Sequence, residues 1–347
     1  MNHGELVRTA PAAARRRRGL LRNPADAHCL VYHGVALAAY GCAFWLYLHP
    51  QSAGIEGPWS RAAFIAAAAF MLGWTSGIDV AVNFHNHAHR RVFWSPRLNR
   101  WVGRLWTFSG GWPSFAFEHA HVVVHHANLL APEDWTLPQP RRDGRVEGII
   151  RYSLLFWPWR AVYHLWQDFT RGRAGHRRHE AARETALFLA LWSIPFWIDL
   201  EMALWLWLLP QWIGNVMLMG GGMYAQHVDC EEKSPAAPYR HSNTSLSPWL
   251  NYTMFNLGYH IEHHDHPNIH WTDLPAQHGK MRPRMRRSGA RVFAIGYHRL
   301  ASVLATPWLS ERRRRRKLPV LPEFAGADAA TAAGSAVPAA DVTAQEA

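Results

Sequence analysis

Residues 62–89 read AAFIAAAAFMLGWTSGIDVAVNFHNHAH, an apolar stretch that runs directly into a cluster of histidines. Between residues 62 and 84 the only charged side chain is that of Asp79. A helix rises about 1.5 Å per residue, so this stretch is long enough to cross a hydrocarbon layer of roughly 30 Å. The stretch therefore predicts a transmembrane helix that carries His85 and His89 to the edge of a membrane.

Three further apolar stretches extend this pattern. Residues 29–48 contain no charged side chain and have the length of a membrane span. Residues 185–198 and 202–225 are joined by a tight connection at Asp199 and Glu201, which predicts a helical hairpin. Together with the first stretch, these segments predict four crossings of the membrane.

Long polar segments separate and follow these spans. The segment between residues 85 and 183 contains two stretches, 101–117 and 149–166, that mix tryptophan with arginine, which is typical of helices at a membrane surface. We therefore expect an all-α membrane protein with four transmembrane helices, interfacial helices and a cytoplasmic, histidine-rich cap. The expected parts are a disordered basic N-terminal arm (1–25), a membrane-bound domain (26–300) and a disordered basic and Ala-rich tail (301–347).

The distribution of charge predicts the orientation of the spans. The chain of 347 residues has a formal net charge of +12, and its arginines gather at the N-terminus, between residues 85 and 183, and toward the C-terminus. By the positive-inside rule these three regions lie on the cytoplasmic side, together with both termini and all the histidine clusters. Nucleic-acid binding would also suit arginine runs, but no motif for it accompanies them, so we expect no nucleic-acid partner.

Nine histidines lie at the ends of the spans or just beyond them, in spacings that suit metal ligation. Histidines three or four residues apart share one face of a helix, and imidazole is a common ligand of transition metals. Neutral imidazoles suit Fe, Zn, Cu or Ni better than Mg or Ca, and this number is about right for two ions. One HxxxH pair alone would be typical of a surface cluster, but three such boxes and the single His227 on one side of a membrane favour a metal centre. The candidate ligands are His85, His89, His121, His125, His126, His227, His260, His263 and His264.

Each histidine box is expected to present two imidazoles on one face and to turn a third toward a neighbouring metal. In the second box His121 and His125 are four residues apart, with His126 adjacent, so we expect the first two to share a face. Carboxylates near the boxes can accept the second ring N–H of a ligand and fix its tautomer. The candidates for this supporting role are Glu118, Asp229, Glu262 and Asp265, and Asn256, before the third box, is a further candidate for a position near the metal.

Three more histidines crowd the set. His87 and His119 could each replace a ligand, although a surface or supporting position is favoured, and the role of His266 stays open. Asp79 is costly within a span unless it is paired. We expect it either to form hydrogen bonds within the helix bundle or to support the metal centre.

These motifs resemble those of the membrane-bound fatty acid desaturase and hydroxylase superfamily. The tract NLGYHIEHHDHPNI (256–269) is similar to the third histidine box of sphingolipid Δ4-desaturases, apart from His266. The tract EHAHVVVHHANLLAPEDW (118–135) resembles the second box of alkane and xylene monooxygenases. The order of two, three, one and three histidines is similar to that of the stearoyl-CoA desaturases. One departure is Met223, which stands where those enzymes have an asparagine that reaches a metal-bound water; Asn256 or Asn215 could serve instead.

The resemblance covers about residues 28–290 and implies a non-haem di-iron oxidoreductase that uses two iron ions, with O2 as co-substrate. It implies that the enzyme introduces a double bond into a fatty acyl chain or related lipid, which could be free or carried by CoA, ACP or another lipid. Hydroxylation, or oxidative decarboxylation, of an acyl or alkyl substrate at the same site is the alternative. From other classes, a zinc-dependent membrane hydrolase and a non-enzymatic metal- or lipid-binding protein remain open.

Such an enzyme needs electrons from outside its own site. The sequence shows no cytochrome b5 tract and no Cys-rich ferredoxin segment. An external donor is therefore implied, such as ferredoxin, rubredoxin or cytochrome b5 with its reductase. Arginines between residues 282 and 291 and in the 85–183 segment offer a docking surface for an acidic partner such as ferredoxin or acyl carrier protein.

Overall fold

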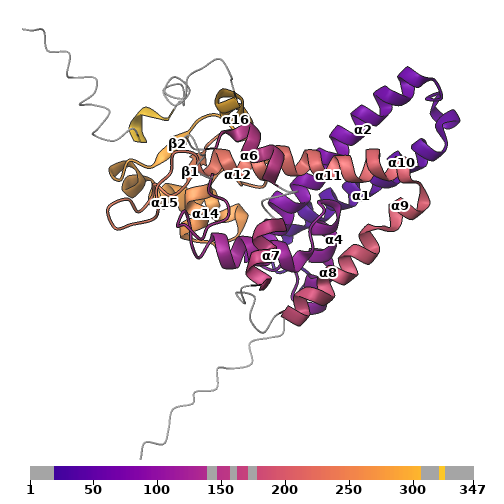
Figure 1. The fold of residues 1–347 in the computed structure, drawn as a ribbon. Helices are drawn as coiled ribbons and strands as arrows, with labels where there is room; N and C mark the ends of the chain where they lie inside the picture. The colour runs from indigo at the N-terminus through magenta and orange to yellow at the C-terminus, as the bar shows by residue number, and fades with distance from the viewer. Residues whose placement is uncertain (1–18, 139–146, 157–161, 171–177, 306–319, 325–347) are drawn as a thin grey trace, which may run out of the picture.

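The computed structural model describes residues 19–138, 147–156, 162–170, 178–305 and 320–324 of the chain. It is mostly helical (Figure 1). The α-helices are α1 (Ala27–Leu48), α2 (Pro58–Ile78), α3 (His85–His89), α4 (Pro96–Ser109), α5 (Ser114–Glu118), α6 (Ile149–Leu155), α7 (Val162–Thr170), α8 (Arg178–Trp192), α9 (Ile194–Ile198), α10 (Leu200–Ala203), α11 (Leu209–Gly214), α12 (Gly221–His227), α13 (Pro248–Thr253), α14 (His260–Asp265), α15 (Leu274–Arg287) and α16 (Tyr297–Ala305). The π-helical turns are Asp79–Phe84, His119–His125, Leu204–Leu208 and Asn215–Gly220, and the strands are β1 (Asn243–Ser245) and β2 (Arg291–Phe293).

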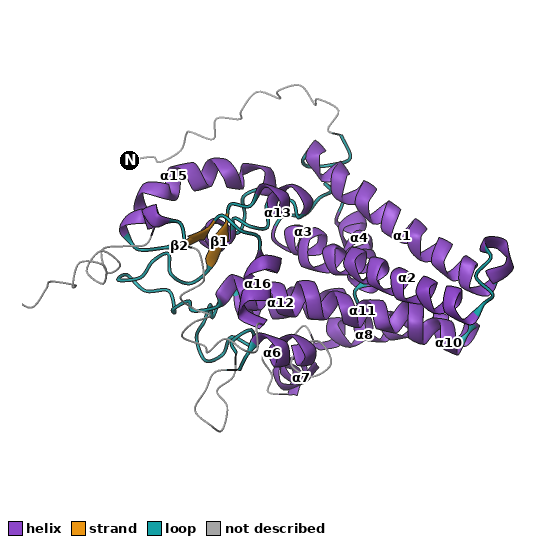
Figure 2. Cartoon of the chain, turned by 90° about the horizontal axis from the view of Figure 1, so that it is seen from above, coloured by secondary structure: helices purple, strands orange, loops and turns teal. Residues whose placement is uncertain are grey.

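Three helical stretches in the described part of the chain are long and apolar enough to cross a membrane. They are Pro24–Leu48, Pro58–His89 and Leu200–His227. Figures 1 and 2 show them side by side along the long axis of the molecule, with α2 packed against α11. The second and third stretches end at His89 and His227, so their C-terminal ends deliver two of the histidine sites to the same end of the bundle.

Glycines allow the close crossing of α2 and α11. A Cβ atom on Gly214 would lie 2.5 Å from the carbonyl oxygen of Gly73 and 3.0 Å from the amide nitrogen of Gly77. Small residues let two helices approach until their backbones touch, which is how many membrane helices associate. The crossing therefore fixes the relative positions of the helices that lead to His85 and His227.

The region of the fourth expected crossing, residues 185–198, is divided between α8 and α9. α8 has 15 residues, and Ser193 separates it from α9, which has five. At about 1.5 Å per residue α8 is roughly 22 Å long, shorter than a hydrocarbon core of about 30 Å. Pro195 lies in the first turn of α9, where a helix tolerates the missing backbone N–H of proline. In the interior of a continuous helix the same proline would remove a hydrogen bond, so α8 does not run on through this position. The described residues thus contain three candidate spans, where the sequence predicts four.

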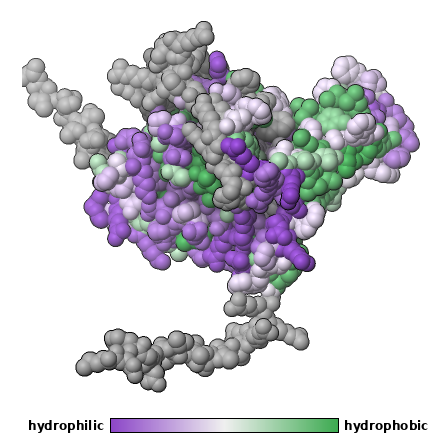
Figure 3. All heavy atoms as spheres, turned by 60° about the horizontal axis from the view of Figure 1, so that its bottom comes forward, coloured by the Kyte–Doolittle hydropathy of each residue, from purple (hydrophilic) through white to green (hydrophobic). Residues whose placement is uncertain are grey.

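The surface of the molecule divides into a hydrophobic and a hydrophilic part. Figure 3 shows hydrophobic side chains on the arm formed by the far ends of the long helices, and hydrophilic side chains over the opposite part. α4 is divided in the same way, because Val102 and Trp106 are buried whereas Trp101 and Leu105 are exposed. Contiguous exposed apolar surface of this kind marks contact with a membrane or a partner.

The C-terminal part, residues 228–305 and 320–324, forms a cap over one end of the helices. Its centre is a two-stranded parallel sheet in which Asn243 pairs with Arg291 and Ser245 with Phe293. α14 and α15 pack beside this sheet around a buried cluster that includes Ile261, Met281, Met285 and Val292. The sheet departs from the all-α expectation, because three-residue strands leave no alternating pattern in a sequence.

The two ends of the described chain both pack onto this framework. Leu21 forms an antiparallel bridge with Phe93, and the Arg22 N–H donates to the Val92 carbonyl at 2.8 Å. Val320 forms a bridge with Phe293 in the cap. Most of the expected N-terminal arm and C-terminal tail lies outside the described residues.

Candidate metal centre

The nine candidate histidines converge into two neighbouring groups. Within each group, one ligand nitrogen from every member lies within 4.8 Å of the others. The five-histidine group contains His85, His89, His121, His126 and His263, and the four-histidine group contains His125, His227, His260 and His264. The rings of His126 and His264, one from each group, stack with their centroids 4.3 Å apart. Residues that are up to 179 positions apart (85 to 264) thus meet at one place.

The first histidine box follows a π-helical turn, Asp79–Phe84, at the end of α2. Such turns are frequent at functional sites. Asp79 is fully buried; it accepts a hydrogen bond from Asn83 Nδ2 at 2.8 Å and pairs with His33 Nδ1 at 2.7 Å. The carboxylate of Asp79 is therefore paired within the helix bundle, which is one of the two roles that we expected for it. These contacts also fix the turn that leads into His85.

The second box forms another π-helical turn, His119–His125. The His126 N–H bonds to the His121 carbonyl at 3.0 Å, and in this i→i+5 geometry residues five apart come onto one face. The Nε2 atoms of His121 and His126 accordingly lie 3.1 Å apart in the five-histidine group. His125 turns to the four-histidine group instead. Our expectation that His121 and His125 would share a face is therefore wrong, because it assumed the narrower α-helical turn.

The third box divides its ligands as an α-helix predicts. His260 and His264, four residues apart on α14, have Nε2 atoms 3.1 Å apart in the four-histidine group. His227, at the end of α12, completes that group with its Nε2 atom 3.1 Å from that of His260. His263 turns the other way, and its Nε2 atom lies 3.3 Å from that of His126.

These distances suit nitrogens that share a metal ion. Two imidazole nitrogens that bind one ion at about 2.1 Å and at right angles lie roughly 3.0 Å apart. In the part of the chain that the structure describes, the buried Nε2 atoms of His89 and His125 have no hydrogen-bond partner. Leaving a buried polar atom unpaired costs about 1–3 kcal/mol, and a bound metal ion would satisfy it. The donor set therefore fits two transition-metal ions, one in each group.

Burial also favours the protonation state that binds metal. Burial lowers the pKa values of His121, His260, His263 and His264 well below the usual value for histidine, and repulsion from neighbouring imidazoles lowers them further. The pKa of His126 falls for the same two reasons. These rings are therefore neutral near pH 7, and each can offer a lone pair to a metal ion.

A buried carboxylate that the sequence analysis missed holds one ligand in position. Asp134 is 1% exposed, and its oxygens lie 3.0 and 3.1 Å from His125 Nδ1. The backbone N–H groups of Leu130 and Thr136 donate to the two oxygens, each at 3.0 Å. Burial alone would raise the pKa of Asp134, but electrostatic attraction to His125 and the hydrogen bonds from His125 and these N–H groups lower it to about 2. An ionised Asp134 keeps the proton of His125 on Nδ1 and leaves Nε2 free for metal.

His227 is oriented by the backbone rather than by a side chain. Its Nδ1 donates to the His241 carbonyl at 3.1 Å, so its Nε2 carries the lone pair that faces His260. No sequence pattern could have identified this partner, because any residue supplies a carbonyl. The signal for Asp134 was present, in contrast, since it lies in the PED tract that follows the second box.

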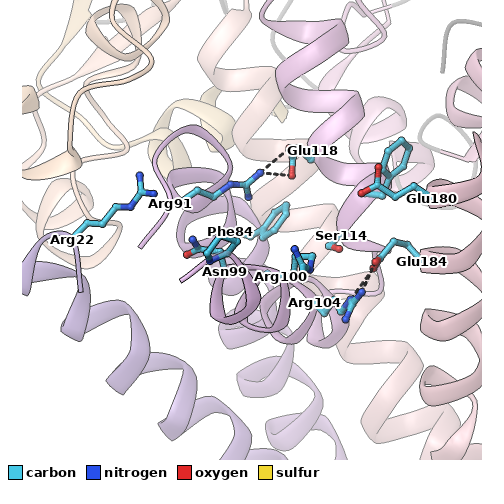
Figure 4. A pocket seen from close by; sticks show the side chains of 13 residues that line it. Arg22, Phe84, Arg91, Asn99, Arg100, Arg104, Ser114, Glu118, Glu180 and Glu184 are labelled. Carbon is cyan, nitrogen blue, oxygen red and sulfur yellow. Dashed lines mark hydrogen bonds and ion pairs between the residues drawn. The ribbon is translucent and has the colours of Figure 1, made fainter. Parts of the chain in front are cut away.

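The five polar residues that we expected to support the ligands make other contacts. Glu118 binds Arg91 through both oxygens at 2.8 Å, at a polar pocket of about 300 Å³ that Figure 4 shows. The partners of the other four are Lys233 for Asp265 (2.7 Å), Arg291 for Asp229 (3.4 Å), the Trp271 carbonyl for Asn256 (3.0 Å), and both Thr244 (2.7 Å) and His278 for Glu262. These contacts are made to residues other than the nine histidines, so a role of these five in supporting the ligands stays a prediction.

The three additional histidines lie outside both groups. His87 uses both ring nitrogens: Nε2 donates to the Asn99 carbonyl at 3.1 Å, and Nδ1 accepts from the Val92 N–H at 3.4 Å. His119 stacks on Phe115, and His266 lies 3.5 Å from a carboxylate oxygen of Asp265. The other candidate for an asparagine near the metal, Asn215, instead binds Trp112 Nε1 at 2.8 Å.

Long apolar helices and two groups of histidines that could each hold a metal ion define the class, a membrane protein with a histidine-rich candidate metal site. A family profile described as fatty acid desaturase matches residues 58–296, which is 239 of the 347 residues. The chain therefore belongs to the fatty acid desaturase family, as its histidine boxes predicted. No curated protein and no solved structure matches it.

Proposed function

We propose that this chain is an O2-dependent di-iron oxidoreductase that introduces a double bond into a fatty acyl chain or a related lipid. Membership of the desaturase family supports the reaction class. The observation that carries the proposal is the pair of adjacent groups, with five and four ligands and no carboxylate in either. Catalytic zinc typically has three protein ligands and an open position, so this donor set disfavours the zinc hydrolase.

The residues of the chain would hold two iron ions, which supply the oxidising power for an unactivated C–H bond when O2 is the co-substrate. The five- and four-histidine groups hold the ions, and Asp134 fixes the tautomer of His125. Aromatic side chains keep water from the centre: Phe117 is buried and stacks on His121 with centroids 5.7 Å apart. Low polarity around the site suppresses side reactions of a strong oxidant.

An apolar cavity on the helices that lead to the metal centre supports a hydrocarbon substrate. Its volume is about 90 Å³, and its lining includes Trp74, Leu218, Gly222 and Met254. Gly222 lies on α12, the helix that ends at His227, and a Cβ atom there would meet nothing within 4 Å. Part of the lining, including Trp74 on α2 and Gly222 on α12, thus belongs to helices that lead to ligands, so a chain lying in the cavity would be held in a fixed position relative to them.

Hydroxylation of an acyl or alkyl substrate is the second candidate. Its support is the second histidine box, which resembles that of alkane and xylene monooxygenases. Both reactions begin by removing hydrogen from a C–H bond, and they differ in whether a second hydrogen is lost or a hydroxyl group is added. The same site would serve either.

The proposed topology keeps four crossings, with the α8–α9 region as the interrupted one and the metal centre and both termini on the cytoplasmic side. This arrangement follows the positive-inside rule. An external one-electron donor supplies the proposed reaction. The proposed partners of this chain are then a membrane, a lipid or acyl substrate and an electron carrier.

Three measurements on one pair of variants test the proposal. We expect the wild-type protein to contain two irons per chain, to consume O2 and to produce an unsaturated lipid detectable by mass spectrometry. His263→Ala removes a ligand of the five-histidine group and should abolish all three, whereas His266→Ala, outside both groups, should abolish none. One zinc per chain with activity in the absence of O2 would contradict the proposal, and a hydroxylated product would favour the second candidate.

A further inference from the structure

α15 (Leu274–Arg287) presents a row of positive charge at the surface of the cap. It contains five basic residues and no acidic one, and all five are exposed. These residues, which we call the α15 basic face, are Lys280, Arg282, Arg284, Arg286 and Arg287. A concentration of one sign of charge on a single helix creates a field that attracts an oppositely charged partner.

Little of this charge is neutralised within the described part of the molecule. Arg282 pairs with Glu323 at 2.7 Å. No described carboxylate forms an ion pair with Lys280, Arg284 or Arg287. Basic residues in a last turn stabilise the C-terminus of a helix, but that effect falls off within one turn and does not account for Lys280.

The opposite side of α15 packs against the helix that carries the third histidine box. His278 is buried, and its Nδ1 is hydrogen-bonded to Glu262 of α14. Glu262 is fully buried and stands next to the ligand His263 in the chain. Met281 and Met285, on the same side of α15, belong to the buried cluster around α14. One helix and a chain of direct contacts therefore separate the α15 basic face from the metal ligands.

The α15 basic face lies away from the arm that would enter a membrane. Figures 1 and 2 both place α15 at the end of the molecule opposite the turn between α1 and α2. Pro58, at the start of α2, and Leu48, at the end of α1, mark that distant turn. The basic face thus faces the aqueous phase and is accessible to a water-soluble protein, while a bilayer surface would lie nearer the junction of cap and helices.

We propose that the α15 basic face is the docking site of an acidic, water-soluble one-electron carrier protein that supplies the metal centre. The inference rests on the proposed function, which consumes electrons. Two substrate hydrogens, two electrons and two protons reduce one O2 to two waters, so each docking oxidises one carrier by one electron and two dockings serve one turnover. The contact of His278 with Glu262 connects α15 directly to α14, the helix that carries His260, His263 and His264.

Binding of a defined probe tests the site without requiring turnover. The full chain in neutral-lipid nanodiscs is titrated with an acidic plant-type [2Fe–2S] ferredoxin at low salt, in the absence of O2 and substrate. The test variant is Lys280→Glu/Arg284→Glu/Arg287→Glu. The matched control, Arg97→Glu/Arg178→Glu/Arg299→Glu, changes exposed arginines on α4, α8 and α16. Three reversals of two charges each lower the formal net charge from +12 to +6 in both variants.

We expect the test variant to bind ferredoxin roughly tenfold more weakly than wild type, and the control to stay within about twofold, because exposed charge pairs contribute modestly and locally. Added salt should weaken wild-type binding and leave the test variant nearly unchanged. Metal content and thermal unfolding must match wild type; if they do not, Lys280→Gln/Arg284→Gln/Arg287→Gln replaces the test variant.

Equal ferredoxin affinity of wild type and test variant would overturn the docking site, and so would equal weakening in both variants, which would indicate net charge alone. The docking site would also be overturned if the test variant bound anionic-lipid nanodiscs more weakly than wild type while its ferredoxin affinity stayed intact. That result would assign the α15 basic face to the membrane. Because binding is measured without O2 or substrate, failure of the proposed reaction would appear as absent product with docking unchanged.

Discussion

Replacing Asp134 with asparagine isolates the contribution of one buried charge to the metal centre. Both carboxylate oxygens lie near His125 Nδ1, and each also accepts a backbone N–H: Oδ1 from Thr136 and Oδ2 from Leu130. An asparagine has one oxygen and one NH2 group, so in either orientation its NH2 group faces one of these donors. Asp134→Asn therefore removes the charge, loses a backbone hydrogen bond and sets two donors against each other.

Two separate magnitudes follow from this geometry. A hydrogen bond to a charged group contributes about 1.5–3 kcal/mol, so the free energy of unfolding of the metal-free protein should fall by about that amount. Losing the partner that orients a ligand histidine typically lowers metal affinity about 10–100-fold. At 1.36 kcal/mol per factor of ten, the second effect is about 1.4–2.7 kcal/mol of binding free energy.

Competition with a coloured chelator measures the metal affinity, and thermal unfolding of the metal-free protein measures the first effect. Asp265→Asn is the matched control, because Asp265 adjoins the third box but pairs with Lys233, and it should change affinity less than twofold. If Asp134→Asn binds metal as tightly as wild type, Asp134 does not set the tautomer of His125. If Asp265→Asn weakens metal equally, the effect reflects general electrostatics.

Three other changes have definite expected results. Gly214→Val would force a Cβ atom to 2.5 Å from the Gly73 carbonyl oxygen, so we expect the free energy of unfolding to fall by about 1–3 kcal/mol and the yield of folded protein to drop. A normal yield and unfolding temperature would refute the close crossing. Gly222→Leu fills open space in the apolar cavity, so lipid profiling should show a shift toward shorter substrates with metal content intact, and an unchanged profile would place the substrate elsewhere. Removing metal with a strong chelator should lower the unfolding temperature of wild type, since an ion bound only to the folded state stabilises it; His266→Ala should behave like wild type, and no shift in either protein would show that the groups bind no metal.

The sequence was most informative where one residue type shows both the chemistry of a site and, through its spacing, its place on a helix. All nine histidines could be selected before the structure was known, because only a few residue types ligate such metals and their spacing places them on helix faces. The three longest apolar stretches were equally plain from their length alone. These features depend on composition and local spacing, which a sequence displays directly.

The sequence was least informative where a small change in backbone geometry decides the outcome. The assignment of His121, His125 and His126 to the two groups depends on a π-helical turn, which has no simple sequence pattern. The partner of His227 is a carbonyl, and that of His125 is a carboxylate nine residues away across a loop. Likewise, the separation of α8 from α9 depends on one serine and one proline in an otherwise apolar stretch.

The division of ligands between the two groups has a consequence for how the protein acquires metal. The second and third boxes each contribute to both groups, because His126 and His263 belong to one while His125 and His264 belong to the other. Ordering these shared helices around a first ion would already arrange most of the second set of ligands. The ordering cost therefore falls mainly on the first binding event. Metal uptake should accordingly be cooperative, with a Hill coefficient above one and little of any species that holds a single ion.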